Sequence, residues 1–136
     1  MAKLLTFIDS GVLITAARSK DIALRQRAFA ILSSPQRNFA SSRFVWLEVM
    51  PKAIWIGNQA ERSLYETFFN AVGHWPQTHD AVIAQAEIEA AAVGLGSMDA
   101  LHIAAAVLLG ADELVTAEGP TKSIHRTKSI KVISIR

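Results

Sequence analysis

Cysteine is absent from the 136 residues of this sequence. Disulfide bonds, thiolate nucleophiles and cysteine-ligated zinc are therefore excluded, and the chain suits a reducing compartment. Long apolar runs are lacking as well: the longest, IAAAVLLGA at 103–111, falls far short of the roughly 20 residues of a membrane helix. The N-terminal apolar stretch is too short for a signal peptide and meets Asp9 at once. We expect a cytoplasmic protein without a membrane segment.

Charged residues are also few, at 19%, against 51% apolar residues. This balance favours a globular protein over a disordered one, and the length suits one domain. Because no linker or low-complexity segment interrupts the chain, we expect residues 1–136 to form a single domain. Acidic residues are missing from 119–136, which contains several Lys and Arg side chains. Such a basic segment fits a polyanionic partner, although a solvated basic edge explains it equally well.

Apolar runs alternate with stretches of helical periodicity along the chain. Strands are expected at 4–9, 39–41, 113–117 and 130–135, and helices at 11–18, 21–33, 43–56, 58–72, 78–93 and 97–110. Pro51 should kink or interrupt the third of these helices, because proline lacks an amide proton and clashes with the preceding turn. Strands that alternate with helices indicate an α/β fold with a parallel sheet flanked by helices.

Four acidic residues are expected at one edge of this sheet. Asp9 ends the first strand, and Glu118 follows the strand ELVTA. The carboxyl ends of parallel strands share an edge, where ligands bind in open α/β sheets. Asp99 lies in the first turn of its helix and Glu48 in the apolar context RFVWLEVM. Helices that cross between parallel strands start near that same edge, so both carboxylates can point to it.

Each of these acids has a simpler explanation when it is taken alone. Asp9 could cap the following helix, and Asp99 could complement a helix dipole. Glu48 could pair with Arg43 or with Lys52, the latter at i+4, and Glu118 could be a turn residue. The hypothesis of a shared site depends on the four acids occurring together.

Clustered carboxylates repel one another unless a cation neutralises them. Hard oxygen ligands select Mg²⁺ or Mn²⁺, which bridge to phosphate oxygens. Such a site can lower the pKa of a bound water and stabilise charge on a scissile phosphate. Without these four acids, 8 of the 12 acidic side chains remain against 14 basic ones. An acidic metal pocket in a basic protein suits a nuclease.

Four motifs carry a resemblance to a known family over nearly the whole chain. FIDSGVLI, SSRFVWLEVMPKA, SMDALHIAAA and ELVTAE together resemble the PIN-domain ribonucleases, especially the VapC-type toxins of prokaryotic toxin–antitoxin modules. The resemblance implies a three-layer α/β/α fold around about four or five parallel strands. It also implies an endoribonuclease that depends on Mg²⁺ or Mn²⁺, a cognate antitoxin protein as partner, and a homodimer.

The resemblance also assigns roles to residues. By motif position, Asp9, Glu48 and Asp99 would be catalytic metal ligands, and Glu118 would be the fourth, at a position where the family usually has Asp. Ser10 would support the site through its hydroxyl. Thr116 would do the same, orienting Asp9 or a metal-bound water.

Other residues have weaker assignments. Lys122 and Arg126 are candidates for RNA-phosphate contacts because they follow Glu118 closely. His102, three residues after Asp99, is interpreted as a core or boundary histidine. Four aromatic residues are expected to fill the core between helices, or in part to form a partner groove or dimer interface: Trp46, Trp55, Phe68 and Phe69. Two rival functions are a nuclease of RNA processing and a catalytically weakened PIN-like module that binds RNA or a protein.

Overall fold

The computed structural model describes residues 2–136 and has the α/β order expected from the sequence. The elements are β1 (Leu4–Ile8), α1 (Ser10–Arg18), α2 (Ile22–Leu32), β2 (Arg37–Ala40), α3 (Arg43–Ile56), α4 (Gln59–Ala71), α5 (His79–Val93), α6 (Ser97–Leu108), β3 (Glu113–Thr116), the 3₁₀ turn η1 (Ser123–Arg126) and β4 (Lys131–Ser134).

The four strands form one parallel sheet in the order β2-β1-β3-β4. In its register, Phe7 of β1 lies between Ala40 of β2 and Leu114 of β3. These three side chains are buried, as expected for central strands covered on both faces. The predicted parallel sheet is therefore confirmed, with four strands.

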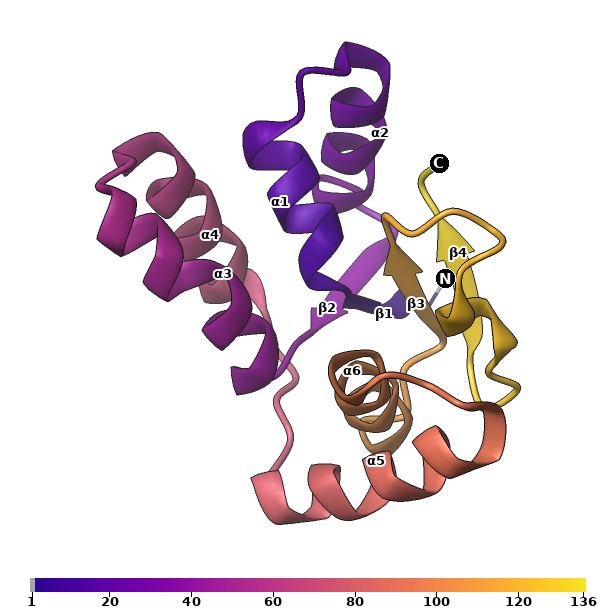
Figure 1. Cartoon of the computed structure of the whole chain (residues 1–136). Helices are drawn as coiled ribbons and strands as arrows, with labels where there is room; N and C mark the ends of the chain where they lie inside the picture. Colours follow the sequence, from indigo (N-terminus) through magenta and orange to yellow (C-terminus); the bar gives the residue numbers. More distant parts are fainter. Residues whose placement is uncertain (1) are drawn as a thin grey trace.

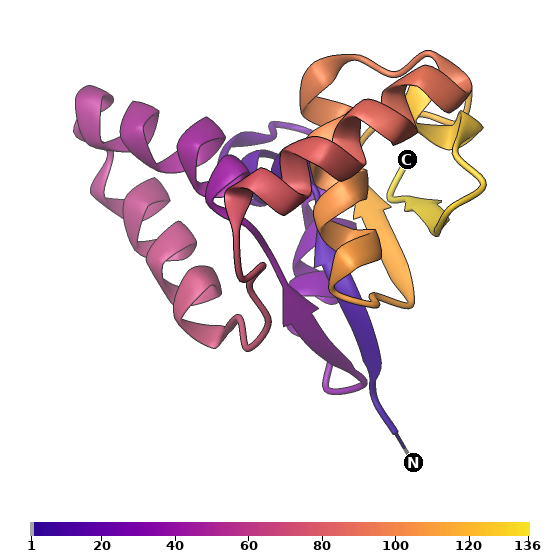
Figure 2. The same cartoon turned by 90° about the horizontal axis from the view of Figure 1, so that it is seen from below.

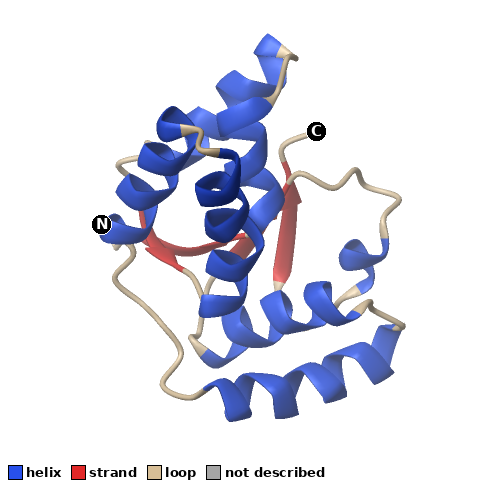
Figure 3. Ribbon diagram, turned by 60° about the vertical axis from the view of Figure 1, so that its left-hand side comes forward, coloured by secondary structure: helices blue, strands red, loops and turns tan. Residues whose placement is uncertain are grey.

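Helices cover both faces of the sheet. Figure 1 shows α1 and α2 on one side and α6 on the other, with α5 packed outside α6. The α3–α4 hairpin stands out beyond the β2 edge, in this view and in the view from below (Figure 2). Figure 3 shows the strands enclosed between the helices. The three-layer α/β/α architecture expected from the resemblance is confirmed.

Helix α6 forms the inner layer on its side and is apolar apart from Ser97, Asp99 and His102. Its residues 102–106 are all buried, between the sheet and α5. Within residues 2–136, no single helix is long and apolar enough to cross a membrane. The pair α5 and α6 reaches that length and composition only together, and it bends by 116° at its break.

Local boundaries differ from the expected ones where side chains make long-range contacts. The second strand begins at Arg37 and not at residue 39, because Arg37 pairs with Leu4 in the sheet and its Nε lies 2.8 Å from Oε2 of Glu113. The third helix continues through Pro51 without interruption. Leu47, whose carbonyl loses its helical donor at Pro51, lies on the exposed side of α3.

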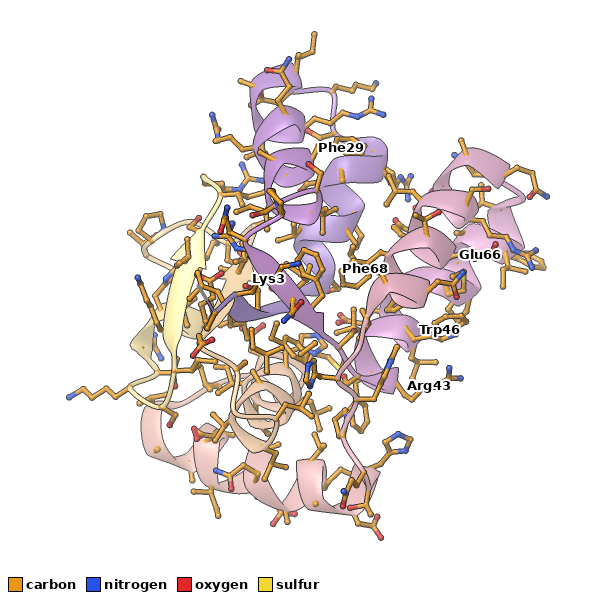
Figure 4. The ribbon with its side chains drawn as sticks, turned by 180° about the vertical axis from the view of Figure 1, so that it is seen from behind. Lys3, Phe29, Arg43, Trp46, Glu66 and Phe68 are labelled. Atoms are coloured by element: carbon orange, nitrogen blue, oxygen red, sulfur yellow. The ribbon has the colours of Figure 1, made fainter. Side chains whose placement is uncertain are left out.

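The aromatic core only partly matches the prediction. Phe68 and Phe69 are buried, and the Trp46 ring packs on Phe69 with 4.8 Å between ring centroids. The Arg43 guanidinium lies over the Trp46 ring, 4.9 Å from its centroid, and both residues belong to α3 (Figure 4). Trp55 is 88% exposed, so its assignment to the core was wrong. Its helix is apolar on several faces, and periodicity therefore does not identify the buried one.

Candidate metal site

The candidate site lies at the point where successive strands are added on opposite sides of β1. The connection after β1 leads to β2 on one side, and the chain later returns to β3 on the other side of β1. Ligand sites of open α/β sheets lie outside the carboxyl ends of strands at such a switch point. Asp9 directly follows β1 here, and Glu118 follows β3 by two residues.

The side chain of Asp9 is held by the sheet and does not cap the helix that follows it. The Thr116 hydroxyl donates to Oδ2 of Asp9 over 2.8 Å, and the Asp9 amide donates to the Val115 carbonyl over 2.9 Å. Asp9 precedes α1, but its side chain accepts no capping hydrogen bond, so the capping alternative is wrong. Burial raises the pKa of Asp9, against the opposing charge of His102 and the Thr116 hydrogen bond.

Glu48 points inward and pairs with a residue of another helix. Nε2 of His102, on α6, makes a short contact with Oε1 of Glu48 and lies 3.7 Å from Oδ1 of Asp9. Burial alone would raise the pKa of Glu48, but the hydrogen bond and charge of His102, helped by the Ser10 hydroxyl, hold it below its usual value. Glu48 therefore pairs with His102 and not with Lys52.

His102 is 1% exposed, so it is a core residue as expected, but it also belongs to the site. Burial would lower the pKa of His102, and the hydrogen bond to Glu48 and the charges of Asp9 and Glu48 raise it overall. Its Nδ1 is buried without a hydrogen-bond partner among the described residues. The sequence signal for its role was its position three residues after Asp99, on a neighbouring face of the same helix.

Asp99 and Glu118 complete the acidic lining. Asp99 lies in the first turn of α6, where burial and the negative charges of Asp9, Glu118 and Glu48 raise its pKa. Glu118 is exposed, and its backbone is anchored: its amide donates to the Thr116 hydroxyl over 3.1 Å, and its carbonyl accepts from the Ser134 hydroxyl over 2.7 Å.

All four acids line one open pocket of about 380 Å³. Its lining also includes Ser10, His102 and Arg136. The predicted RNA contacts Lys122 and Arg126 do not line it: Arg126 instead donates to the Val93 carbonyl over 3.3 Å at the end of α5. Arg136 was missed as a site residue, although its place after the last parallel strand is the signal that would have found it.

The four carboxylates give the pocket mainly hard oxygen donors, which suit Mg²⁺ or Mn²⁺. In the described part of the chain, no three His, Asp or Glu side chains already converge as ligands of one ion. Mg²⁺ does not require such a cage, since it usually keeps several waters and binds one or two carboxylates. Burial and then repulsion from the neighbouring carboxylates raise the pKa of Asp99, and a bound cation would relieve the repulsion.

Comparison with known proteins identifies the fold. No protein-family model and no curated protein matches the chain. Among solved structures, a chain of a toxin–antitoxin complex from Klebsiella pneumoniae matches with a TM-score of 0.72 at 19% identity, over 96% of this chain and 98% of that one. A chain of DNA-bound VapBC from Salmonella typhimurium matches with a TM-score of 0.67 at 20% identity, over the full length of both. The chain has the PIN-like fold.

A third similar structure, FitAcB from Neisseria gonorrhoeae, gives a TM-score of 0.63 at 16% identity over 96% of this chain and 97% of that one. The PIN-like fold expected from the four motifs is therefore confirmed over nearly the whole chain. The pocket described above lies at the carboxyl edge of this PIN-like sheet.

The pair of His102 and Glu48 predicts a pH-dependent contribution to stability. The lowered pKa of Glu48 makes its contribution present above about 4.5, its ordinary value, and lost as the pH falls further. The raised pKa of His102 makes its contribution complete below 6.5 and lost as the pH rises through the folded-state value. Urea unfolding of EDTA-treated protein should therefore show that His102→Gln loses the most unfolding free energy between pH 4.5 and pH 6.5.

The matched control for that measurement is His79→Gln, which changes an exposed histidine on α5. We expect its loss of unfolding free energy to be small at every pH. A loss for His102→Gln that stays constant from pH 5 to pH 9 would contradict a charged pair.

Proposed function

We propose that this protein is a metal-dependent endoribonuclease and the toxin of a toxin–antitoxin pair. One observation carries the proposal: four carboxylates from four separate segments of the chain line a single pocket at the switch point of a PIN-like sheet. A buried carboxylate is costly unless it has a role or a partner. Asp9 is buried and Asp99 is half-buried, and neither pairs with Lys or Arg among the described residues. His102 lies near Asp9 but is shared with Glu48, and this supports a cation as the remaining counter-charge.

The chain's own residues divide the work of the site. Asp9 and Asp99 would hold Mg²⁺ or Mn²⁺, with Glu118 at the open side of the pocket. Thr116 keeps the Asp9 carboxylate in one orientation through its hydroxyl. His102 holds Glu48 toward the same pocket. When bound, the ion supplies Lewis-acid stabilisation of charge on the scissile phosphate and lowers the pKa of a bound water.

The proposal is tested by cleavage of a mixed RNA pool with Mg²⁺ or Mn²⁺. We expect wild-type protein to cleave, and both EDTA and Asp99→Asn to stop it. Cleavage that persists in EDTA would contradict metal dependence, and equal cleavage by Asp99→Asn would place the activity elsewhere. Expression in a bacterial host separates a toxin from an RNA-processing enzyme, because only the toxin should cause growth arrest that depends on Asp99.

A protein partner is the second part of the proposal. The similar structures are a toxin–antitoxin complex, VapBC and FitAcB. Helix α3 has an exposed apolar face formed by Leu47, Ile54 and Trp55. Contiguous exposed apolar surface commonly marks a protein interface. We propose that this face of α3 binds an antitoxin and that it can also bind a second copy of this chain. Light scattering of the protein alone, and mixed with the product of the neighbouring gene, distinguishes dimer from complex.

The alternative candidate is a catalytically weakened module that binds RNA or protein. It is favoured by the engagement of Glu48 with His102 and by glutamate at position 118. In that case Mn²⁺ titration should show weak binding, and RNA cleavage should be absent even after removal of any co-purified partner.

A further inference from the structure

Beside the acidic pocket lies a second groove, of about 590 Å³, with a different chemical character. It is formed by α2 and the end of β4, and its lining is mostly apolar, with Ile31, Ile133 and Ile135. Two arginines line it, Arg27 and Arg136, and no acidic residue does. Arg136 lines both the groove and the acidic pocket, so the two are neighbours on either side of this residue.

The two arginines are held by the backbone in a way that leaves their charge available. Nε of Arg27 donates to the Ile135 carbonyl over 2.7 Å, and Nε of Arg136 donates to the Ala117 carbonyl over 2.6 Å. Within residues 2–136, neither guanidinium makes a further hydrogen bond or an ion pair. The terminal amino groups of each can therefore donate to a phosphate.

We propose that this groove binds the nucleotide next to the scissile phosphate. This inference rests on the proposed ribonuclease activity and identifies where its substrate binds. Arg136 contacts the backbone phosphate at the border of the acidic pocket, and Arg27 contacts the next phosphate along the RNA. The base lies against the isoleucine side chains. A base stacked and paired within a duplex is not free to enter such a groove.

The charge pattern favours RNA over an acidic protein segment as the occupant. The groove and the pocket proposed to hold the scissile phosphate share Arg136, so a chain with regularly spaced phosphates can occupy both at once. A mostly apolar lining with two arginines matches a base flanked by two phosphates. Grooves of this volume lie within the range of ordinary small-ligand sites, roughly 300–1,000 Å³.

The test measures RNA binding without cleavage. Asp99→Asn protein, in Mg²⁺, is titrated with a fluorescein-labelled unstructured RNA oligonucleotide and with the same strand in a duplex. Adding Arg27→Gln or Arg136→Gln should weaken single-strand binding about tenfold, as loss of a charged hydrogen bond does. Each should also lower the slope of log K against log salt by about 0.7. The duplex should bind more weakly than the single strand and respond little to either substitution.

Lys131→Gln is the matched control, because it removes the same charge from the opposite end of β4. It should leave the affinity and the salt slope close to those of the parent. Arg136→Lys is a second variant, which should keep the salt slope and lose part of the affinity, since lysine lacks the planar fork of donors.

The outcomes separate this inference from the function on which it rests. If wild type cleaves RNA but both arginine variants bind like Lys131→Gln, the groove inference fails and the ribonuclease stands. Loss of affinity for the protein partner alone would assign the groove to that partner and overturn the inference. If Asp99→Asn binds no RNA and wild type cleaves none, both proposals fail.

Discussion

Asp9→Asn is expected to abolish RNA cleavage and, at neutral pH, to stabilise the metal-free protein. The loss of activity should exceed about 100-fold, since even residues that only orient a metal ligand commonly change activity 10–100-fold. The gain in stability has a separate cause. Asp9 is buried beside other carboxylates, and its folded-state pKa is raised above 3.8. Asparagine keeps an acceptor for the Thr116 hydroxyl and carries no charge.

The sign of the pH dependence follows from this raised pKa. Folded protein binds the Asp9 proton more tightly than unfolded protein does, so the stability of the wild type falls as the pH rises above 3.8 through the folded-state pKa. The difference from Asp9→Asn should therefore be small in acid and largest at neutral pH. A gain on the order of 1 kcal/mol would raise the Tm by roughly 3–5 °C.

Thermal unfolding in EDTA and cleavage assays in Mg²⁺ measure the two effects on the same protein. The matched control is Asp112→Asn, which changes an exposed carboxylate at the opposite edge of the sheet, where it accepts from the Leu5 amide over 2.7 Å. That control should cleave like the wild type. Asp9→Asn that cleaves normally would remove Asp9 from the site. Asp9→Asn that is less stable at neutral pH would show that its buried charge is not a cost.

The position of the site could be predicted from the sequence because it follows from chain topology. Residues after parallel strands share one sheet edge, and this rule alone is enough to bring Asp9 and Glu118 together. The same rule places Arg136, which follows β4. The position of Asp99 at this edge could be predicted because Asp99 lies at the start of its helix. None of these positions depends on details of side-chain packing.

Side-chain pairing across helices could not be predicted in the same way. Glu48 and His102 are 54 positions apart, and their contact depends on how α3 packs against α6. Local spacing offered Lys52 as the partner of Glu48, but the carboxylate points inward. The exposure of Trp55 is a similar case, because the apolar residues of α3 do not form a single stripe that would identify its buried face.

Glu113→Ala is expected to destabilise the fold by about 3 kcal/mol, the low end of the 3–5 kcal/mol typical when one partner of a buried ion pair is removed. Oε2 of Glu113 accepts from the Thr6 hydroxyl over 2.6 Å and from Nε of Arg37 over 2.8 Å. The Glu113 side chain is 4% exposed and that of Arg37 is 18% exposed. These three residues belong to β3, β1 and β2, so one carboxylate joins three neighbouring strands.

The matched control is Glu66→Ala, which breaks an ion pair of the same length in a different environment. Nε of Arg62 lies 2.8 Å from Oε1 of Glu66, but both side chains are more than 40% exposed on α4 (Figure 4). Its loss should cost about 0.5 kcal/mol or less, because exposed pairs gain little over their hydration. Urea unfolding should therefore separate the two variants by several-fold in free energy, although the two bonds have equal length.

A third variant distinguishes the ion pair from packing as the source of the loss. Replacing Glu113 and Arg37 together with methionine removes both charges and keeps most of the volume, so much of the stability should return. If the double variant is as unstable as Glu113→Ala, the loss comes from packing or from the unpaired Thr6 hydroxyl. Because Glu113 begins β3 at the edge opposite the acidic pocket, RNA cleavage by the folded fraction should be unchanged in all of these variants.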